Sequence, residues 1–556
     1  MQQLSGLDAA FLYLETGNMP MHIGSLAIYD PSTAPGGQVG FKDILRFFEQ
    51  RLSKARAFRE RLARVPLGLD HPYWIDDSDF DLEFHIRHIA LPRPGDWRQL
   101  CIQVARLHAR PLDTSRPLWE AYVIEGLDNV EGMPRGSFAL VTKFHHAAID
   151  GVSAAEIMGA FHDLTPQGQI ADPGTSWRPE RAPTPVELLA RSAVTAIRQP
   201  LAMAQLALRN IPTVARFGKG LLTREFDMKV KVPRTRFNSN VSAHRVFDGA
   251  SFALEDIKAI RTKVADATVN DVVVSFCGGA LRKYLQAKDE LPTESLVAMA
   301  PVSARSESQR RTAGNQVSTM SLPVGSDIDD PIDRLRAVTS ESGRAKKLTA
   351  TVGASLAAEA AQFLPSTTTG LFAKAYGRSG LAKRIPPIYN TIITNIPGVK
   401  VPLYSMGSKL IANYGLGPVA HGLGLFQPVV GYNGMITVSA ISCREMMPDP
   451  AFYCDCLRAA FAELKSAAAK LPVAVDTKAR SAQAKHAKVT TASVKAPDAG
   501  PALAKQPVTK AKKSARRKKT APEPDSASAG ARAAKTRPNK RAKSGSMGIP
   551  KPGTEK

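Results

Sequence analysis

The segment from residue 138 to residue 164 constrains the fold most, because its apolar periodicity changes within a few residues. Up to His146, successive side chains alternate between two faces, as expected for a strand. Ser153 and Glu156 then have the spacing of a capping box, and apolar residues recur at helical spacing through Leu164. We therefore predict a strand that ends in a tight turn and leads directly into a helix.

Strand and helix patterns also alternate elsewhere in the first 472 residues. A chain of 556 residues exceeds what one hydrophobic core usually organises, and 44% hydrophobic with 22% charged residues is typical of a globular protein. We expect a mixed α/β fold with two lobes, residues 1–174 and 241–472, joined by a linker, residues 175–240. Expected strands are 22–29, 118–124, 137–146, 244–247 and 435–441, and expected helices are 41–55, 254–264, 270–286 and 451–470.

A basic tail, residues 473–556, follows these lobes. It carries 21 Lys and Arg against 5 Asp and Glu, a net charge of +16, so that residues 1–472 carry +8 of the total of +24. The tail is rich in Ala, Lys, Pro, Ser and Thr and has no aromatic residue with which to build a core. We predict that it is disordered and that it binds anionic lipid or nucleic acid through its charge.

The linker has a basic amphipathic pattern from Val186 to Leu222, after a stretch that contains three prolines. Its cations are set among Leu, Ile, Ala and Met with little acid, which is typical of helices that lie at a membrane surface. A helix that packs its apolar face on one lobe has the same pattern, so both interpretations stay open.

No apolar stretch is long enough to span a bilayer, and the first residues lack the pattern of a secretory signal. The five cysteines show neither a disulfide framework nor paired CxxC spacing. We expect a reduced, cytoplasmic protein without a metal site.

Two histidines, His145 and His146, stand at the predicted end of the strand, with Asp150 and Gly151 in the turn that follows. Imidazole titrates near neutral pH, and a neighbouring carboxylate or carbonyl can fix its tautomer, so such a turn suits general acid–base chemistry. Along a regular strand the two rings point to opposite faces. Asp150 either orients a histidine or organises the turn through backbone amides, and Gly151 supplies backbone freedom.

The pattern His145-His146-x-x-x-Asp150-Gly151 resembles the signature of the CoA-dependent acyltransferase superfamily. Other segments are similar to the bacterial wax ester synthase/diacylglycerol acyltransferase family within it, in the family's order over about residues 1–470. These segments are Leu4 to Glu15, Pro20 to Gly24, Pro117-Leu118-Trp119, Thr268 to Asp271, Pro301 to Arg305 with Gly314-Asn315, and Thr394 to Gly398.

The resemblance implies a two-lobed fold with an interlobe channel and the histidine turn near its middle. It implies an O-acyltransferase that moves a long-chain acyl group from acyl-CoA, a substrate, to diacylglycerol or a long-chain alcohol, with no cofactor and no metal. His146 would be the general base, and no covalent enzyme intermediate is needed. Because the acceptors are lipids, we expect peripheral association with the inner membrane face or with lipid inclusions.

Supporting roles are expected for three further motifs. Asn270 and Asp271 open a helix, whose first turn can stabilise an oxyanion or simply cap the helix. We expect structural or channel roles for the remaining residues of the family motifs: Pro117, Leu118, Trp119, Asn395, Pro397 and Gly398.

Two rival functions remain at this point. One is a transferase with the same histidine motif that takes acyl groups from a carrier domain. The other is a polyanion-binding or granule-binding protein that acts through its basic tail, although the tail lacks the aromatic residues or folded reader of specific nucleic-acid recognition.

Overall fold

The computed structural model describes residues 1–149, 154–168, 179–198, 205, 208, 231–303, 317–352, 384–396 and 398–474. The chain divides into two units, Met1–Ala487 and Lys488–Lys556, and every described residue belongs to the first. From residue 475 onward the predicted tail lies outside the described residues, as does most of the linker. The fold below is therefore that of the first unit.

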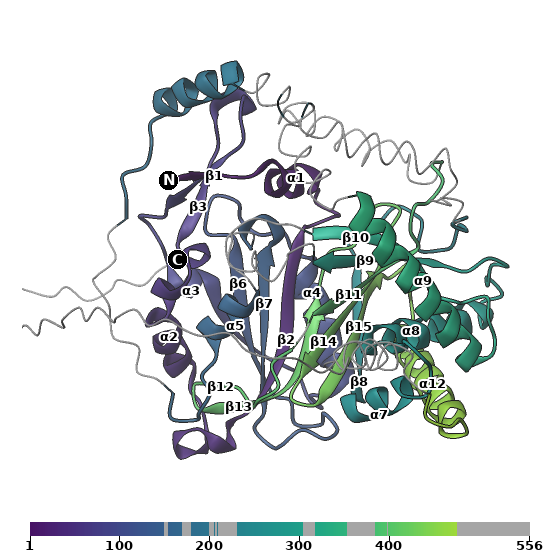
Figure 1. Cartoon of the computed structure of the whole chain (residues 1–556). Helices are drawn as coiled ribbons and strands as arrows, with labels where there is room; N and C mark the ends of the chain where they lie inside the picture. Colours follow the sequence, from purple (N-terminus) through teal and green to yellow (C-terminus); the bar gives the residue numbers. More distant parts are fainter. Residues whose placement is uncertain are drawn as a thin grey trace, which may run out of the picture. The chain divides into compact units, whose positions relative to one another are not determined.

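The first large sheet has six strands in the order β12-β13-β2-β7-β6-β5 (Figure 1). Only β5 and β6 pair in parallel, so the sheet is mixed. Its strands are β2 (His22–Asp30), β5 (Ile86–Ala90), β6 (Trp119–Glu125), β7 (Phe138–His145), β12 (Tyr404–Ser405) and β13 (Ser408–Leu416).

The second large sheet also has six strands, in the order β10-β9-β11-β14-β15-β8, with β11 parallel to both of its neighbours. Its strands are β8 (Arg245–Ala253), β9 (Val297–Ser303), β10 (Val317–Pro323), β11 (Thr391–Ile396), β14 (Leu425–Tyr432) and β15 (Met435–Cys443). A small third sheet contains β1 (Gln2–Gln3), β4 (Tyr73–Asp76) and β3 (Glu60–Ala63).

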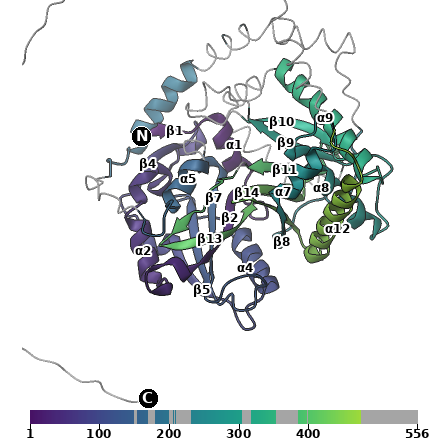
Figure 2. The ribbon, with the colours of Figure 1, turned by 60° about the horizontal axis from the view of Figure 1, so that its bottom comes forward.

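Helices cover the two large sheets. The long helices α8, α9 and α12 pack against one another beside the second sheet (Figures 1 and 2). The described helices are α1 (Gly6–Leu14), α2 (Phe41–Glu49), α3 (Leu82–His85), α4 (Trp97–Ala109), α5 (Ala154–Phe161), a helix over residues 185–198, α7 (Leu254–Arg261), α8 (Val269–Gln286), α9 (Pro331–Val352) and α12 (Pro450–Ala469).

These elements confirm the mixed α/β class and most of the expected strands and helices. The helix expected over 41–55 is wrong beyond Glu49, where two 3-10 turns follow. In that stretch Arg51 is buried, pairs with Asp163 at 2.6 Å and lies over the Phe47 ring. A tertiary ion pair thus replaces the last turns of the predicted helix.

Residues from late in the chain complete the first sheet. Strand β13 pairs with β2 in antiparallel register from Lys409↔Asp30 to Leu416↔Gly24, with one bulge. Helix α4 also links the two large sheets, because the Trp97 Nε1–H donates to Asp248 of β8 at 2.8 Å. One continuous apolar core consequently contains residues from both large sheets.

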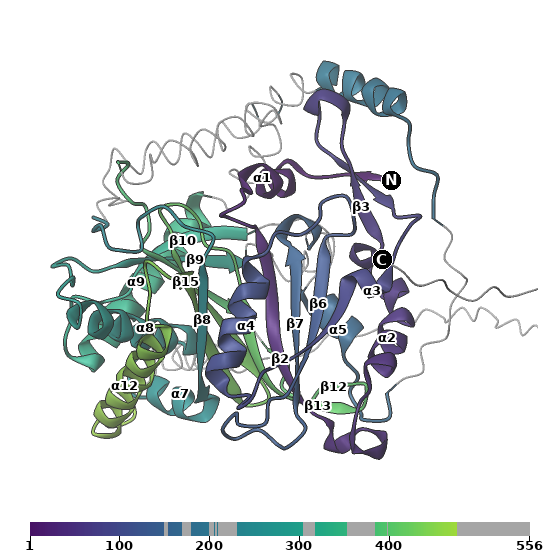
Figure 3. The same cartoon turned by 180° about the vertical axis from the view of Figure 1, so that it is seen from behind.

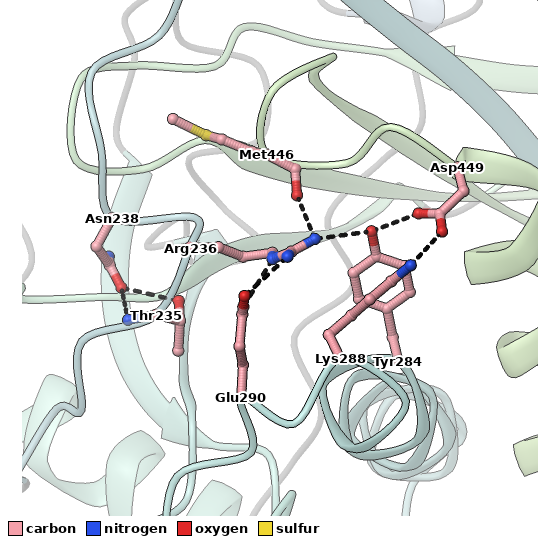
Figure 4. A network of polar contacts seen from close by, with 8 residues as sticks. All are labelled: Thr235, Arg236, Asn238, Tyr284, Lys288, Glu290, Met446 and Asp449. Carbon is pink, nitrogen blue, oxygen red and sulfur yellow. Dashed lines mark hydrogen bonds and ion pairs between the residues drawn. The ribbon is translucent and has the colours of Figure 1, made fainter.

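A polar network around Arg236 fixes the chain that leads from the linker into β8 (Figure 4). The Arg236 guanidinium donates to both carboxylate oxygens of Glu290, at 2.7 and 2.8 Å. Tyr284 of α8 donates to Asp449 at 2.6 Å, and Lys288 pairs with the other oxygen of Asp449. The network ties the chain that leaves the linker to α8 and to the start of α12.

All five cysteines are buried and none forms a disulfide. None of the described helices is both long and apolar enough to cross a membrane.

Gly24 allows the central strands to approach closely, because a Cβ atom there would lie 1.9 Å from the Thr142 carbonyl oxygen. We predict that Gly24→Ala lowers the free energy of unfolding by about 2–3 kcal/mol, since β2 and β7 would have to separate. Gly17→Ala is the matched control, because no atom lies within 4 Å of its added Cβ. Urea denaturation measures both, and equal stability of the two variants would contradict the prediction.

Candidate active site

Strand β7 ends between the two histidines. His145 is its last residue, and His146 begins a 3-10 turn, η6 (His146–Ala148). The His145 N–H donates to the Leu118 carbonyl at 2.9 Å, and the His146 N–H donates to the Met21 carbonyl at 2.8 Å. Backbone on both sides of β7 therefore fixes the point at which the turn begins.

The His145 ring is fully buried and holds the turn from inside. Its Nδ1 accepts the Ala147 N–H at 3.1 Å, so this nitrogen carries a lone pair. Its Nε2 lies 3.4 Å from Glu15 Oε2 and is the nitrogen left to carry the proton. Nδ1 is thus hydrogen-bonded, and Nε2 lies within ion-pair distance of Glu15.

Glu15 lies between two histidines. Its Oε1 is 3.5 Å from His22 Nε2 and accepts the Met21 N–H at 3.3 Å. Burial alone would raise the pKa of Glu15, but the contacts with His145 and His22 outweigh it and hold that pKa at about 2. Burial also lowers the pKa of His22. At neutral pH a carboxylate therefore anchors the end of β7 against the start of β2.

The His146 ring is only partly buried, unlike that of His145. It stacks on Phe11 with ring centroids 3.8 Å apart and planes 14° apart. Phe11 and Glu15 are four residues apart at the end of α1, so one side of this helix contacts both histidines. Figure 1 shows α1 lying over the start of β2.

A buried ion pair supports the sheet next to this turn. Lys143 of β7 is fully buried, lies 2.9 Å from Glu120 and donates to the Arg110 carbonyl at 3.0 Å. Tyr122 donates to the same Glu120 at 2.6 Å. Lys143 Nζ also donates to the Leu107 carbonyl at 3.3 Å, so all three of its N–H groups are engaged and the pair fixes the end of α4 against β7.

Three predicted site residues are not among the residues that the structure describes, namely Asp150, Gly151 and Pro397. The turn-organising role of Asp150 therefore stays a prediction. Among the residues that are described, no three His, Cys, Asp or Glu side chains are grouped to hold a metal ion.

The Pro117-Leu118-Trp119 segment is built into the core beside β7. The Leu118 carbonyl accepts the His145 N–H, and the Pro117 carbonyl accepts the Trp119 N–H at 2.8 Å. Trp119 is fully buried, and its indole N–H donates to the Phe58 carbonyl at 3.0 Å. In this structure the segment positions the strand end through its backbone.

Two motifs far apart in the sequence meet at the second sheet. The Asn395 Nδ2–H donates to Asn270 Oδ1 at 3.2 Å. Asp271 confirms the predicted capping box, since its Oδ2 accepts the Thr268 N–H at 2.9 Å and its own N–H donates to Thr268 Oγ1. Gly398 is closely packed, because a Cβ atom there would lie 1.2 Å from the Gly431 carbonyl oxygen.

Sequence reasoning did not single out Phe11, Glu15 or His22 as neighbours of the histidines. Phe11 and Glu15 belong to the opening segment that resembles the family, and their spacing places them on one side of a helix. The spacing of Phe11 and Glu15 indicates that they share one side of a helix. Their contact with the end of β7 depends on tertiary structure, which the spacing does not indicate.

Comparison with known proteins now gives the family. The wax ester synthase/diacylglycerol acyltransferase catalytic domain matches residues 4–273, and the C-terminal domain of the same family matches residues 313–465. A protein of Mycobacterium tuberculosis (strain CDC 1551 / Oshkosh), whose name assigns it provisionally as a diacylglycerol O-acyltransferase, is 33% identical over 452 residues, which are 81% of this chain and 87% of that protein. The chain belongs to the wax ester synthase/diacylglycerol acyltransferase family.

Solved structures agree with this assignment. The wax ester synthase/diacylglycerol acyltransferase from Marinobacter aquaeolei VT8 has a TM-score of 0.58 and 28% identity, and the match covers 84% of this chain and 100% of that chain. The trichothecene 15-O-acetyltransferase from Fusarium sporotrichioides shares the fold, with a TM-score of 0.52 at 10% identity over 83% of this chain and 94% of that chain. The expected acyltransferase fold and enzyme class are confirmed.

We predict that His146→Ala lowers the turnover of this family member by roughly 10²–10⁴-fold and leaves its melting temperature near that of the wild type. His145→Ala should cost less turnover and more stability, because it removes a buried ring and leaves Glu15 with one partner fewer. CoA release and thermal melting of both variants provide the comparison. Full turnover by a folded His146→Ala protein would exclude it as the base.

Glu15 makes the stability depend on pH. The pKa of this carboxyl falls from its ordinary value of 4.5 to about 2 in the folded protein, so its contribution is complete above about pH 6 and disappears as the pH falls toward 2. We predict that Glu15→Gln costs on the order of 2–3 kcal/mol at pH 7 and less as the pH is lowered from 6 to 3. Urea denaturation across this range tests it, and a difference that stays constant with pH would contradict it.

Proposed function

We propose that the protein transfers a long-chain acyl group from acyl-CoA to the hydroxyl of diacylglycerol, which makes triacylglycerol. The observation that carries this proposal is the different environment of the two histidines. Both ring nitrogens of His145 face the protein, whereas His146 is partly exposed at the start of the turn and stacks on Phe11. We therefore assign the role of general base to His146, whose ring is the less buried of the two.

In the proposed reaction His146 accepts the proton of the acceptor hydroxyl as its oxygen attacks the thioester carbonyl carbon. The carbon–sulfur bond of the tetrahedral intermediate then breaks, and the thiolate of CoA leaves. The proton held by His146 passes to this thiolate, so that the imidazole is neutral again. The protein forms no covalent bond with the acyl group, and the new ester and free CoA account for all atoms.

Diacylglycerol is the first candidate acceptor because curated relatives at 32–33% identity are named as diacylglycerol O-acyltransferases. A long-chain alcohol is the second, because the name of the Marinobacter relative of known structure includes wax ester synthesis. Both acceptors present a primary or secondary hydroxyl on a long apolar body, so the same base serves either.

We further propose that the protein works at the surface of the inner membrane or of lipid inclusions, where these acceptors reside. The tail of net charge +16 would then attract the protein to anionic headgroups. This attraction is electrostatic, so salt screens it and nucleic acid competes with it.

An assay of the purified full-length chain tests the reaction. Palmitoyl-CoA is supplied with dioleoylglycerol or with hexadecanol in detergent, and both free CoA and the ester product are measured. We expect triacylglycerol and CoA in equal amounts, with the His146→Ala protein as the inactive control. Ester formed only with hexadecanol would make the protein a wax ester synthase.

The rival functions give different results in this assay. No CoA release with either acceptor, but transfer from an acylated carrier domain, would favour the carrier-dependent transferase. No transfer from any donor by a folded protein that still binds DNA would favour a polyanion-binding role.

A further inference from the structure

The helix described over residues 185–198 packs on the protein through its less apolar side. A capping box starts it: the Thr184 N–H donates to Glu187 Oε2 at 2.7 Å, and the Glu187 N–H donates to Thr184 Oγ1. On the inward side Leu188 and Ser192 are buried, and Leu188 packs in a small cluster with Val65 and Tyr73. Little apolar area is covered by this contact.

The outward side of the same helix is apolar and exposed. At 100° per residue its residues span roughly 160° of the helix circumference without a charged side chain. Val186 is 74% exposed and Ile197 is 75% exposed. The full set is Val186, Leu189, Ala190, Ala193, Val194, Ala196 and Ile197, all exposed. An ordinary surface helix has the opposite orientation, with its apolar side against the core.

Positive charge runs along one edge of this apolar side. Arg191 and Arg198 are exposed there, and neither has an ion-pair partner among the residues that the structure describes. Glu187 shares that edge but pairs with Arg181 at 2.5 Å, so it does not cancel the arginines. An apolar side with cations at its border is the pattern of a helix that lies in the plane of a membrane surface.

A hairpin tip adds two further exposed leucines beside the helix. Between β3 and β4, Leu67 is 87% exposed and Leu69 is 56% exposed. Leu67 has a φ of 58°, a left-handed conformation that is unusual for a bulky residue. Val65 of the same turn belongs to the cluster that holds Leu188, so the tip and the helix flank one cluster. Figures 1 and 3 show the helix lying against this hairpin.

We infer that the outward side of residues 185–198, together with Leu67 and Leu69, is a lipid-docking surface. Contiguous apolar patches that are exposed on a protein surface mark interaction sites. The side chains of this surface offer no hydrogen-bond donor or acceptor that would orient a protein partner, and the cations at its border match anionic headgroups. The occupant is therefore the interfacial layer of an anionic phospholipid membrane or monolayer.

This inference rests on the proposed function only because a lipid acceptor requires the enzyme to reach a lipid surface. It also resolves which side of the amphipathic linker faces outward over the described residues. Apolar insertion persists at high salt, unlike the attraction due to a charged tail.

Flotation of the full-length chain with vesicles tests the docking surface. The vesicles contain phosphatidylcholine with one quarter phosphatidylglycerol, and the salt is low or on the order of 0.5 M, which screens the tail. At high salt we expect Val186→Asp with Ile197→Asp to lower the ratio of bound to free protein by about tenfold or more. Leu67→Ser with Leu69→Ser should lower it by several fold, on the order of the loss of two inserted side chains.

Ile388→Asp is the matched control, because Ile388 is also an exposed aliphatic residue, 70% exposed, and lies in the loop before β11. It should float like the wild type. Equal flotation of wild type and the helix variant at high salt, or equal loss in the control, would overturn the inference. So would a lower melting temperature of the helix variant, or a smaller oligomer of the variant than of the wild type, because the apolar side would then be covered by the chain itself or by a second copy.

Two readouts separate this inference from the proposed reaction. The helix variant should still transfer acyl groups to detergent-dispersed acceptor within about twofold of the wild type, since no surface is required there. The His146→Ala protein should float normally and transfer nothing. A wild type that floats but does not catalyse would overturn the proposed reaction and leave the docking surface standing.

Discussion

Strand β2 is hydrogen-bonded on both sides, to β7 from early in the chain and to β13 from nearly 400 residues later. Without β13, a central strand of the first sheet would leave one row of backbone groups unpaired, which is costly in a buried sheet. The first sheet is therefore complete only when the second half of the chain is present. The match to the family's catalytic domain ends at residue 273, well before β13, so that region alone lacks two strands of its own sheet.

His22 of the same strand contacts the carboxylate of Glu15, which is largely shielded from solvent. Removing a lone charge from water is costly, whereas this carboxylate has two imidazoles and a backbone N–H around it and can hold its neighbours in place. This arrangement makes His145 part of the scaffold, while the His146 ring is only partly buried. The two adjacent histidines thus have different environments because β7 ends between them.

Local pattern was sufficient to predict β7, the following helix α5 and the capping box at Thr268, because these depend on neighbours in sequence. It failed where distant residues decide the outcome. Helix α2 ends early beside the pair Arg51–Asp163, and β12 and β13 join a sheet that their sequence does not indicate. For the site, His145 and His146 could be located from sequence, but Glu15 could not be assigned to them. For the linker helix, periodicity shows that one side is apolar and cannot say which side the protein covers.

The burial of all five cysteines has a consequence for the thiol chemistry of the protein. Desolvation raises the pKa of every one of these thiols, and the thiolate is the reactive species. We therefore expect the folded protein to react only slowly with disulfide dyes and with oxidants. Free coenzyme A in solution reacts fast with such a dye, whereas the five cysteine thiols should become accessible to it only when a chain unfolds. One reagent can then follow product formation by its fast signal and loss of native protein by its slow one.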